Sequence, residues 1–153
     1  MLAQVERLLQ ENKLCVLCTA GENKPHCSLM TYMPGEDPRV LYMVASRESK
    51  KYQNMLGNPD VSLLIDNRKG LGLEEQKISA VSLSGIYQLV DSAELVEIGI
   101  KFTKMYPELA EIINNPSSAL FAVKLQSFLF LAGPVDSYKG DFFSLPPLLS
   151  ELG

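Results

Sequence analysis

The chain has 153 residues, of which 46% are hydrophobic and 21% charged, and its formal net charge is −4. This length suffices for one domain with a real core and is too short for two ordinary ones, so we expect a single domain over residues 1–153. The negative charge argues against an extended nucleic-acid-binding surface, because such surfaces bind phosphate backbones through clusters of Lys and Arg side chains.

No apolar run approaches the roughly 20 residues that cross a bilayer. The N-terminus lacks the basic-then-apolar order of a secretory signal. Three cysteines, an odd number, fit a reducing compartment better than a disulfide framework. We therefore expect a cytoplasmic protein that binds neither nucleic acid nor membrane.

Short apolar runs recur along the chain between Gly, Pro, Asn and Asp residues, and they predict β-strands. These runs cover 14–19, 27–33, 39–45, 61–66, 78–90, 119–126 and 128–133. Helical patterns interrupt them at the opening residues, after Ser49, and over 93–105, where Leu95, Ile98 and Phe102 share a face and Asp91 or Ser92 is the expected cap. Residues 67–76 and the tail with Pro146-Pro147 have the composition of loops. This rhythm is typical of a barrel or a sandwich.

Cys15 and Cys18 have the spacing of a redox or metal pair. On a strand, however, positions three apart point to opposite faces and cannot close on one metal. We expect no metal site here. Cys15 and Cys18 are expected to be buried, reduced and slow to react, and Cys27, at the start of the next strand, to be more accessible.

The segment from Ser46 to Lys51 predicts an anion site. Ser46 follows a strand-like run, and Ser46 or Ser49 can cap the helix that follows. The serine hydroxyls, the first free N–H groups and the positive end of the helix dipole would then converge where Lys50 and Lys51 add charge, with Arg47 as a lesser candidate. Judged locally, the alternative is that the serines only cap the helix and the lysines are only solvated.

The order of these segments carries a family resemblance. Its pieces are a short helix, a strand ending in Thr19, a glycine turn followed by Pro25-His26, two further strands, the element Ser49-Lys50-Lys51-x-x-Asn54-Met55, Asn58-Pro59 before another strand, and a long strand with Gly85 at its centre. In this order residues 1–105 resemble the pyridoxamine 5'-phosphate oxidase-like family of flavin-binding split barrels.

The resemblance implies a mainly β fold, an antiparallel split barrel of six or seven strands with peripheral helices. It also implies FMN bound noncovalently in a groove between the subunits of a homodimer. Lys51, Asn54 and Ser49 match the Lys, Asn and Ser of the family motif, and Ser46 matches its small hydroxyl residue. With the phosphate there, the flavin ring would lie near the end of the second strand, so Met30, Thr31 and Tyr32 are the candidates for ring contacts.

The leading functional hypothesis is an FMN-dependent oxidoreductase with a small-molecule substrate or electron donor, in which the cofactor carries the electron chemistry. The alternatives are a flavin- or haem-binding protein without turnover, and a cofactor-free dimeric module. Members that oxidise pyridoxamine phosphate carry an Arg-x-His motif near the C-terminus, whereas this sequence has no Arg or His after Arg68, so that activity is not expected. No catalytic acid or base can be named. Apolar tail residues are expected to support the dimer or to pack on their own barrel, namely Phe142, Phe143, Leu145, Leu148 and Leu149.

Overall fold

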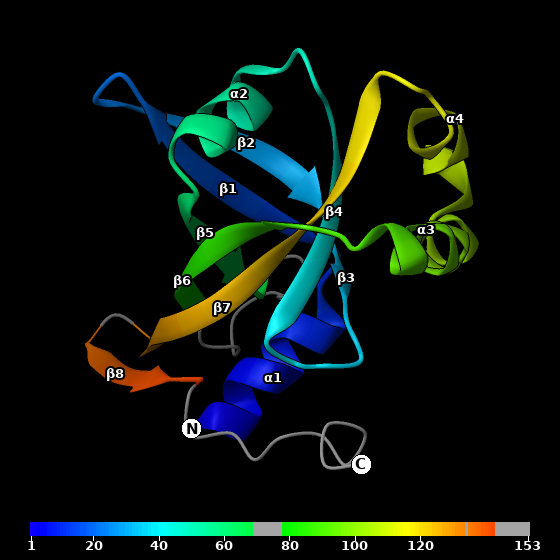
Figure 1. The fold of residues 1–153 in the computed structure, drawn as a ribbon. Coiled ribbons are helices and arrows are strands. Elements are labelled where there is room, and N and C mark those ends of the chain that lie inside the picture. The colour runs from blue at the N-terminus through cyan, green and yellow to red at the C-terminus, as the bar shows by residue number, and fades with distance from the viewer. Residues whose placement is uncertain (69–77, 134, 143–153) are drawn as a thin grey trace.

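One antiparallel sheet, curled on itself, forms the framework of the protein (Figure 1). The computed structural model describes residues 1–68, 78–133 and 135–142. The helices are α1 (Leu2–Glu11), α2 (Lys50–Gly57), α3 (Ser92–Met105) and α4 (Ala110–Ile113), the last preceded by a 3₁₀ turn (Pro107–Leu109). The strands are β1 (Leu14–Gly21), β2 (Lys24–Thr31), β3 (Met33–Pro34), β4 (Val40–Ser46), β5 (Asp60–Asp66), β6 (Ser79–Leu89), β7 (Ser118–Ala132) and β8 (Asp136–Asp141).

The strand order explains why the sheet curls. The strands run β2-β1-β5-β6-β7-β4-β3, and β8 pairs with the second half of β7. The two edge strands, β2 and β3, are separated in the chain by Tyr32 alone, so the edges of the sheet must come back together. The result is a half-open antiparallel barrel with peripheral helices, as predicted. The described sheet has eight strands rather than six or seven, because β3 and β8 were not anticipated.

Strand β7 corrects the prediction of two separate strands over 119–126 and 128–133. It is one strand of 15 residues with a bulge, since Ser84 pairs with Ser127 while Gly85 pairs with Leu125. The extra residue, Gln126, shifts the inward face from odd to even positions. In the sequence, the break in the alternation of inward and outward side chains resembles the end of a strand, although the strand continues through it.

Helices close the barrel and cover one side of it (Figure 1). Helix α1 buries Val5, Leu8 and Leu9 at one end, and α2 buries Tyr52 and Met55 in the same core. Helix α3 packs Ile98 and Phe102 into a second cluster with Met33 and Tyr106, which Tyr42 and Leu120 of the sheet extend. Leu95, predicted to share the face of Ile98 and Phe102, is 41% exposed.

The predicted helix caps are confirmed. The Ser49 hydroxyl accepts from Tyr52 N at the start of α2, and the Asp91 carboxylate accepts from Ala93 N at the start of α3. Phe142 lies in the core of its own barrel, against Phe128. Most of the predicted loop (69–76) and the tail with Phe143, Leu145, Pro146-Pro147, Leu148 and Leu149 lie outside the described residues. None of the helices in the described ranges has the length and apolarity needed to cross a bilayer.

The cysteines follow the alternation of β1 and β2. Cys15 is buried and Cys18 points to the other face, which confirms that they cannot share one metal ion. Cys27 is exposed, as expected. The expectation that Cys18 is a core residue is wrong, because the outer face of β1 is only half covered at this position.

Two glycine substitutions test the bulge. A Cβ at Gly85 would lie 2.6 Å from Val123 Cγ1 and 3.1 Å from the Lys124 carbonyl oxygen, whereas one at Gly99 in α3 would meet nothing within 4 Å. We expect Gly85→Ala to lower the free energy of unfolding by about 1–3 kcal/mol through overpacking. Gly99→Ala, the matched control, should raise it by about 0.5–1 kcal/mol. Urea denaturation measures both, and equal effects would contradict the close packing at Gly85.

Candidate functional site

The turn between β4 and α2 brings the predicted serines together. The Ser49 hydroxyl donates to the Ser46 carbonyl oxygen at 2.7 Å and accepts from Tyr52 N at 3.4 Å, so the protein uses both of its hydrogen-bonding functions. The Ser46 hydroxyl accepts from Glu48 N at 3.2 Å and is exposed, which leaves its own hydrogen available to a ligand. Ser46 is therefore the hydroxyl donor of this turn, and Ser49 is its structural support.

The start of α2 adds backbone donors. The first bond along the helix runs from Gln53 N to the Ser49 carbonyl oxygen, so the N–H groups of Lys50 and Lys51 precede it and have no acceptor within the helix. The Lys50 side chain is exposed and that of Lys51 is half-buried. Two N–H groups, two ammonium groups and one hydroxyl thus come from six consecutive residues, a donor set suited to a phosphate group.

Arg47 turns away from this set. Its Nη1 donates to the Ser118 carbonyl oxygen at 2.8 Å, and its backbone N–H donates to the Ser117 carbonyl oxygen at 2.8 Å. These bonds tie the turn to the start of β7. The structure therefore brings Ser46, Ser49, Lys50 and Lys51 together on one short segment and directs Arg47 to the neighbouring cleft.

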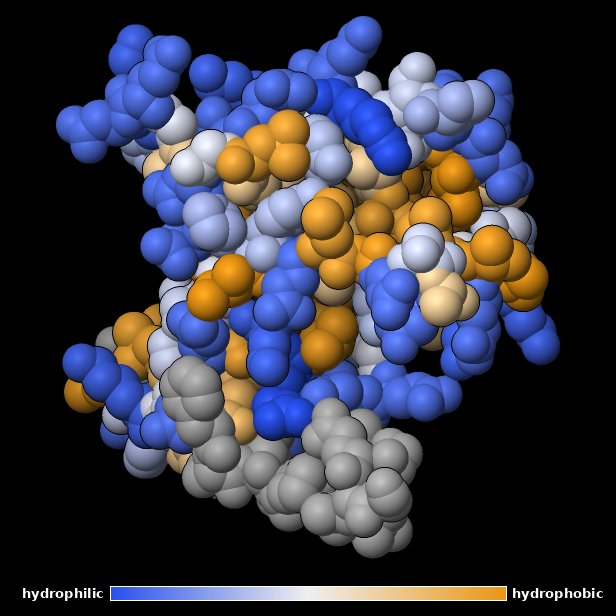
Figure 2. All heavy atoms as spheres, in the orientation of Figure 1, coloured by the Kyte–Doolittle hydropathy of each residue, from blue (hydrophilic) through white to orange (hydrophobic). Residues whose placement is uncertain are grey.

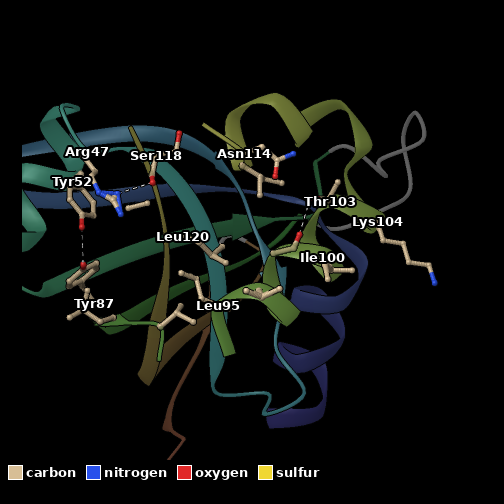
Figure 3. Close-up of a pocket in the computed structure, with 16 residues that line it drawn as sticks. Arg47, Tyr52, Tyr87, Leu95, Ile100, Thr103, Lys104, Asn114, Ser118 and Leu120 are labelled. Carbon is tan, nitrogen blue, oxygen red and sulfur yellow. Dashed lines mark hydrogen bonds between the residues drawn. The ribbon is translucent and has the colours of Figure 1, made fainter. Parts of the chain in front are cut away.

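This cleft has a volume of about 700 Å³ and lies between α3, α4 and strands β6 and β7 (Figure 3). Its far walls are apolar, with Leu95, Ile100 and Leu120 among them, and apolar side chains gather beside α3 on the face shown in Figure 2. Arg47, Tyr52, Tyr87 and Ser118 form its polar end.

Tyr52 and Tyr87 pack edge to face at the polar end of the cleft, with ring centroids 6.1 Å apart. The Tyr87 hydroxyl donates to the Tyr52 hydroxyl at 3.4 Å. Burial, and then this hydrogen bond, raise the pKa of Tyr87 above its ordinary value. The Tyr87 phenol is therefore neutral at physiological pH and acts as a hydrogen-bonding group there.

Asn54 fixes helix α2 against the β1–β2 hairpin. Its Nδ2 donates to Thr19 Oγ1 at 3.1 Å, and both side chains are buried. A Cβ at Gly21 would lie 2.9 Å from Asn54 Cγ, so any larger residue at this position would force the Asn54 side chain to shift. Sequence comparison with the family motif singled out Asn54 but did not identify Thr19 and Gly21 as its partners, because they lie 33 or more residues away in the chain.

The side chains of Met30 and Tyr32 belong to the core. Met30 is buried, and the Tyr32 hydroxyl donates to the Leu9 carbonyl oxygen at 2.7 Å. Tyr106 in turn donates to the Tyr32 carbonyl oxygen at 2.6 Å. Of the three residues predicted near the flavin ring, only Thr31 has a half-buried side chain outside this core. Any contact from Met30 or Tyr32 would have to come from the backbone.

The backbone of β2 does have an unpaired edge within the described part of the sheet. The two-residue turn at Glu22 and Asn23 makes Gly21 and Lys24 a hydrogen-bonded pair, so even-numbered residues of β2 bond to β1. Odd-numbered residues point their N–H and C=O groups to the unpaired edge. Pro25, which has no N–H, occupies one of these positions.

Ser28 lies on this strand and was not singled out in the sequence. Among the buried side-chain oxygens and nitrogens of residues 1–68, 78–133 and 135–142, only Ser28 Oγ lacks a hydrogen-bond partner. A buried hydroxyl without a partner costs about 1–3 kcal/mol, so it usually meets a ligand or a water. The sequence did carry a signal for this group, because Ser28 is a polar residue on the same strand face as His26 and Met30.

The curled sheet, with helices at its ends and on its outer side, defines a split barrel. A family model described as pyridoxamine 5'-phosphate oxidase matches residues 1–132, and the chain belongs to this family. A Schizosaccharomyces pombe protein described as a pyridoxamine 5'-phosphate oxidase homolog is 35% identical over an alignment of 71 residues, and this alignment covers 41% of this chain and 37% of that protein. The chain thus spans little more than a third of the length of the curated relative it matches.

Solved structures show the same fold. A haem-binding protein from Mycobacterium smegmatis superimposes with a TM-score of 0.77 at 15% identity, covering 90% of this chain and 56% of that one. An FAD-binding protein from Mesorhizobium loti superimposes with a TM-score of 0.64 at 17% identity, covering 85% of this chain and 93% of that one. At these identities the likeness establishes the architecture alone.

A double-mutant cycle tests the role of Asn54. Asn54→Leu leaves the buried Thr19 hydroxyl without its donor, so we expect the free energy of unfolding to fall by about 1–3 kcal/mol. The double variant Asn54→Leu/Thr19→Val removes both polar groups and should recover at least about 0.5 kcal/mol of that loss. Additive effects of the two substitutions in urea denaturation would contradict a direct interaction.

Proposed function

We propose that this chain binds FMN noncovalently and works as an oxidoreductase on a small-molecule substrate or electron donor. Membership of the pyridoxamine 5'-phosphate oxidase family and the likeness to an FAD-binding structure support a flavin. The observation that carries the proposal is the donor set at the start of α2. There Ser46 Oγ and the N–H groups of Lys50 and Lys51 have no acceptor among the residues that the structure describes.

The residues present fit both ends of such a ligand. The phosphate would take the hydroxyl of Ser46 and the N–H and ammonium groups of Lys50 and Lys51. The planar ring would lie toward β2, whose unpaired edge offers backbone donors and acceptors at Cys27, Leu29 and Thr31. The Ser28 hydroxyl, which has no partner among the described residues and lies on the inward face of the same strand, would supply one further group for a polar ring edge.

A bound flavin would supply the electron transfer, and the chain would supply position and polarity. Asn54, in the middle of α2, holds this helix against β1, so a buried contact sets the position of the phosphate donors relative to the β1–β2 hairpin. Arg47, held by Ser117 and Ser118, places a cation at the polar end of the adjoining cleft. That cleft is large enough for a small apolar substrate.

Haem binding without turnover is the second candidate. It is favoured by the likeness to the haem-binding protein from Mycobacterium smegmatis and by His26, the one histidine in the chain, which is half-buried on β2. An imidazole is a usual axial ligand of haem iron. The phosphate-sized donor set at α2 favours FMN over this candidate, because haem carries carboxylates and no phosphate.

We also propose a homodimer, because a groove on a small barrel encloses only part of a flavin and a second subunit would complete the enclosure. Exposed apolar residues beside the cleft, Leu89, Val96 and Ile100, are suited to such a contact. Sedimentation equilibrium at micromolar concentration should give twice the chain mass of 16.9 kDa. A mass near that of one chain would refute the dimer.

Removing the two lysines tests the phosphate site. We expect Lys50→Ala/Lys51→Ala to weaken FMN far more than riboflavin, because only FMN carries the phosphate. Charge-assisted hydrogen bonds contribute roughly 1.5–3 kcal/mol each, so the FMN dissociation constant should rise more than about tenfold in a fluorescence titration.

The control for this titration is Lys124→Ala/Lys139→Ala. It removes the same charge on β7 and β8, and Lys124 pairs with Val40 at the opposite end of β4 from Ser46. This variant should bind both ligands as the parent does. Equal losses of FMN and riboflavin in the α2 variant would mean that the phosphate is bound elsewhere.

A further inference from the structure

Cys18 and Cys27 form a thiol pair on the outer face of the β1–β2 hairpin. They are direct partners in the register, and their Sγ atoms lie 3.4 Å apart. Cys27 is exposed and Cys18 is half-buried. The proposed flavin site uses neither side chain, since both point away from the barrel interior.

The hairpin geometry explains why the two sulfurs are so close. Because even-numbered residues of β2 bond to β1, Cys18 and Cys27 are a non-hydrogen-bonded pair. In such a pair the Cα atoms are about 4.5 Å apart, which falls within the range that disulfides span. A bond between these sulfurs therefore requires little movement of the backbone.

We propose that Cys18 and Cys27 are a site of reversible oxidation, at which hydrogen peroxide converts the two thiols into one intrachain disulfide. The exposed Cys27 meets the peroxide first. Cys27 gives up its thiol proton, and its thiolate sulfur attacks one peroxide oxygen. The O–O bond breaks, Cys27 becomes a sulfenic acid, and the hydroxide that leaves takes up the released proton to form water. The Cys18 sulfur then attacks the Cys27 sulfur, the S–O bond breaks, and the thiol proton leaves with the hydroxyl group as water. In total, two thiols and one peroxide give one disulfide and two waters.

The assignment of roles follows from exposure and ionisation. Burial, and then the hydrogen bond with Cys27, raise the pKa of the Cys18 thiol to about 11, so little of it is the reactive thiolate and Cys18 does not react first with peroxide. Its sulfur, 3.4 Å from that of Cys27, is instead placed to attack the sulfenic acid. Burial raises the pKa of Cys15 to about 12 on the opposite face of β1, so Cys15 stays out of the reaction. The chain thus contains its own unreactive control thiol.

The test is peptide mapping of the full-length protein after exposure to hydrogen peroxide. Free thiols are blocked with iodoacetamide in denaturant, and the digest is analysed by mass spectrometry with and without dithiothreitol. We expect Cys18 and Cys27 to disappear from the alkylated pool in equal amounts, to appear in one linked peptide pair, and to return after reduction. Cys15 should stay fully alkylated throughout.

Two variants separate this pair from general thiol oxidation. Cys18→Ser should abolish the intrachain disulfide and leave sulfenic or sulfinic acid on Cys27, whereas Cys15→Ser should form the disulfide as the parent does. Circular dichroism checks that each variant is folded. Oxidation of Cys27 to sulfinic acid in the parent while Cys18 stays free, or a disulfide between two chains only, would overturn the proposal. The result does not depend on whether FMN binds.

Discussion

The contact between Asn54 and the β1–β2 hairpin is the constraint on which the candidate site depends. The Asn54 amide donates to Thr19 and packs so closely on Gly21 that a side chain there would force Asn54 to move. Helix α2 would otherwise be free to slide on the end of the barrel, because its eight residues bury few apolar side chains. With Asn54 in place, the donors at Ser46, Lys50 and Lys51 keep a defined position relative to strand β2.

The curl of the sheet supplies the second part of the site. Because β2 and β3 are consecutive in the chain yet lie at opposite edges of the sheet, closing the barrel leaves the backbone of β2 unpaired on one side. The same strand directs Ser28 inward, with no hydrogen-bond partner in the described ranges, and Cys27 outward beside Cys18. The cofactor contact proposed for Ser28 and the thiol chemistry proposed for Cys18 and Cys27 therefore use opposite faces of one hairpin.

Local patterns predicted much of this structure, and long-range contacts account for what they missed. The caps at Ser49 and Asp91 and the opposite faces of Cys15 and Cys18 follow from neighbours a few residues away, so the sequence predicts them well. The bulge at Gln126 broke the two-residue period and made one strand resemble two. Arg47 points away from the other predicted phosphate ligands because it bonds to Ser118, 71 residues later in the chain. The burial of Tyr32 depends on Leu9 and Tyr106. No local pattern contains such partners.

The central proposal is that the start of α2 holds the phosphate of FMN and the edge of β2 holds its ring. The most direct test is the absorbance spectrum of the protein as purified, followed by mass identification of any small molecule released on denaturation. The account predicts the two visible bands of an oxidised flavin and the release of FMN. A Soret band with release of haem, or a colourless protein that fails to bind added FMN, would contradict it.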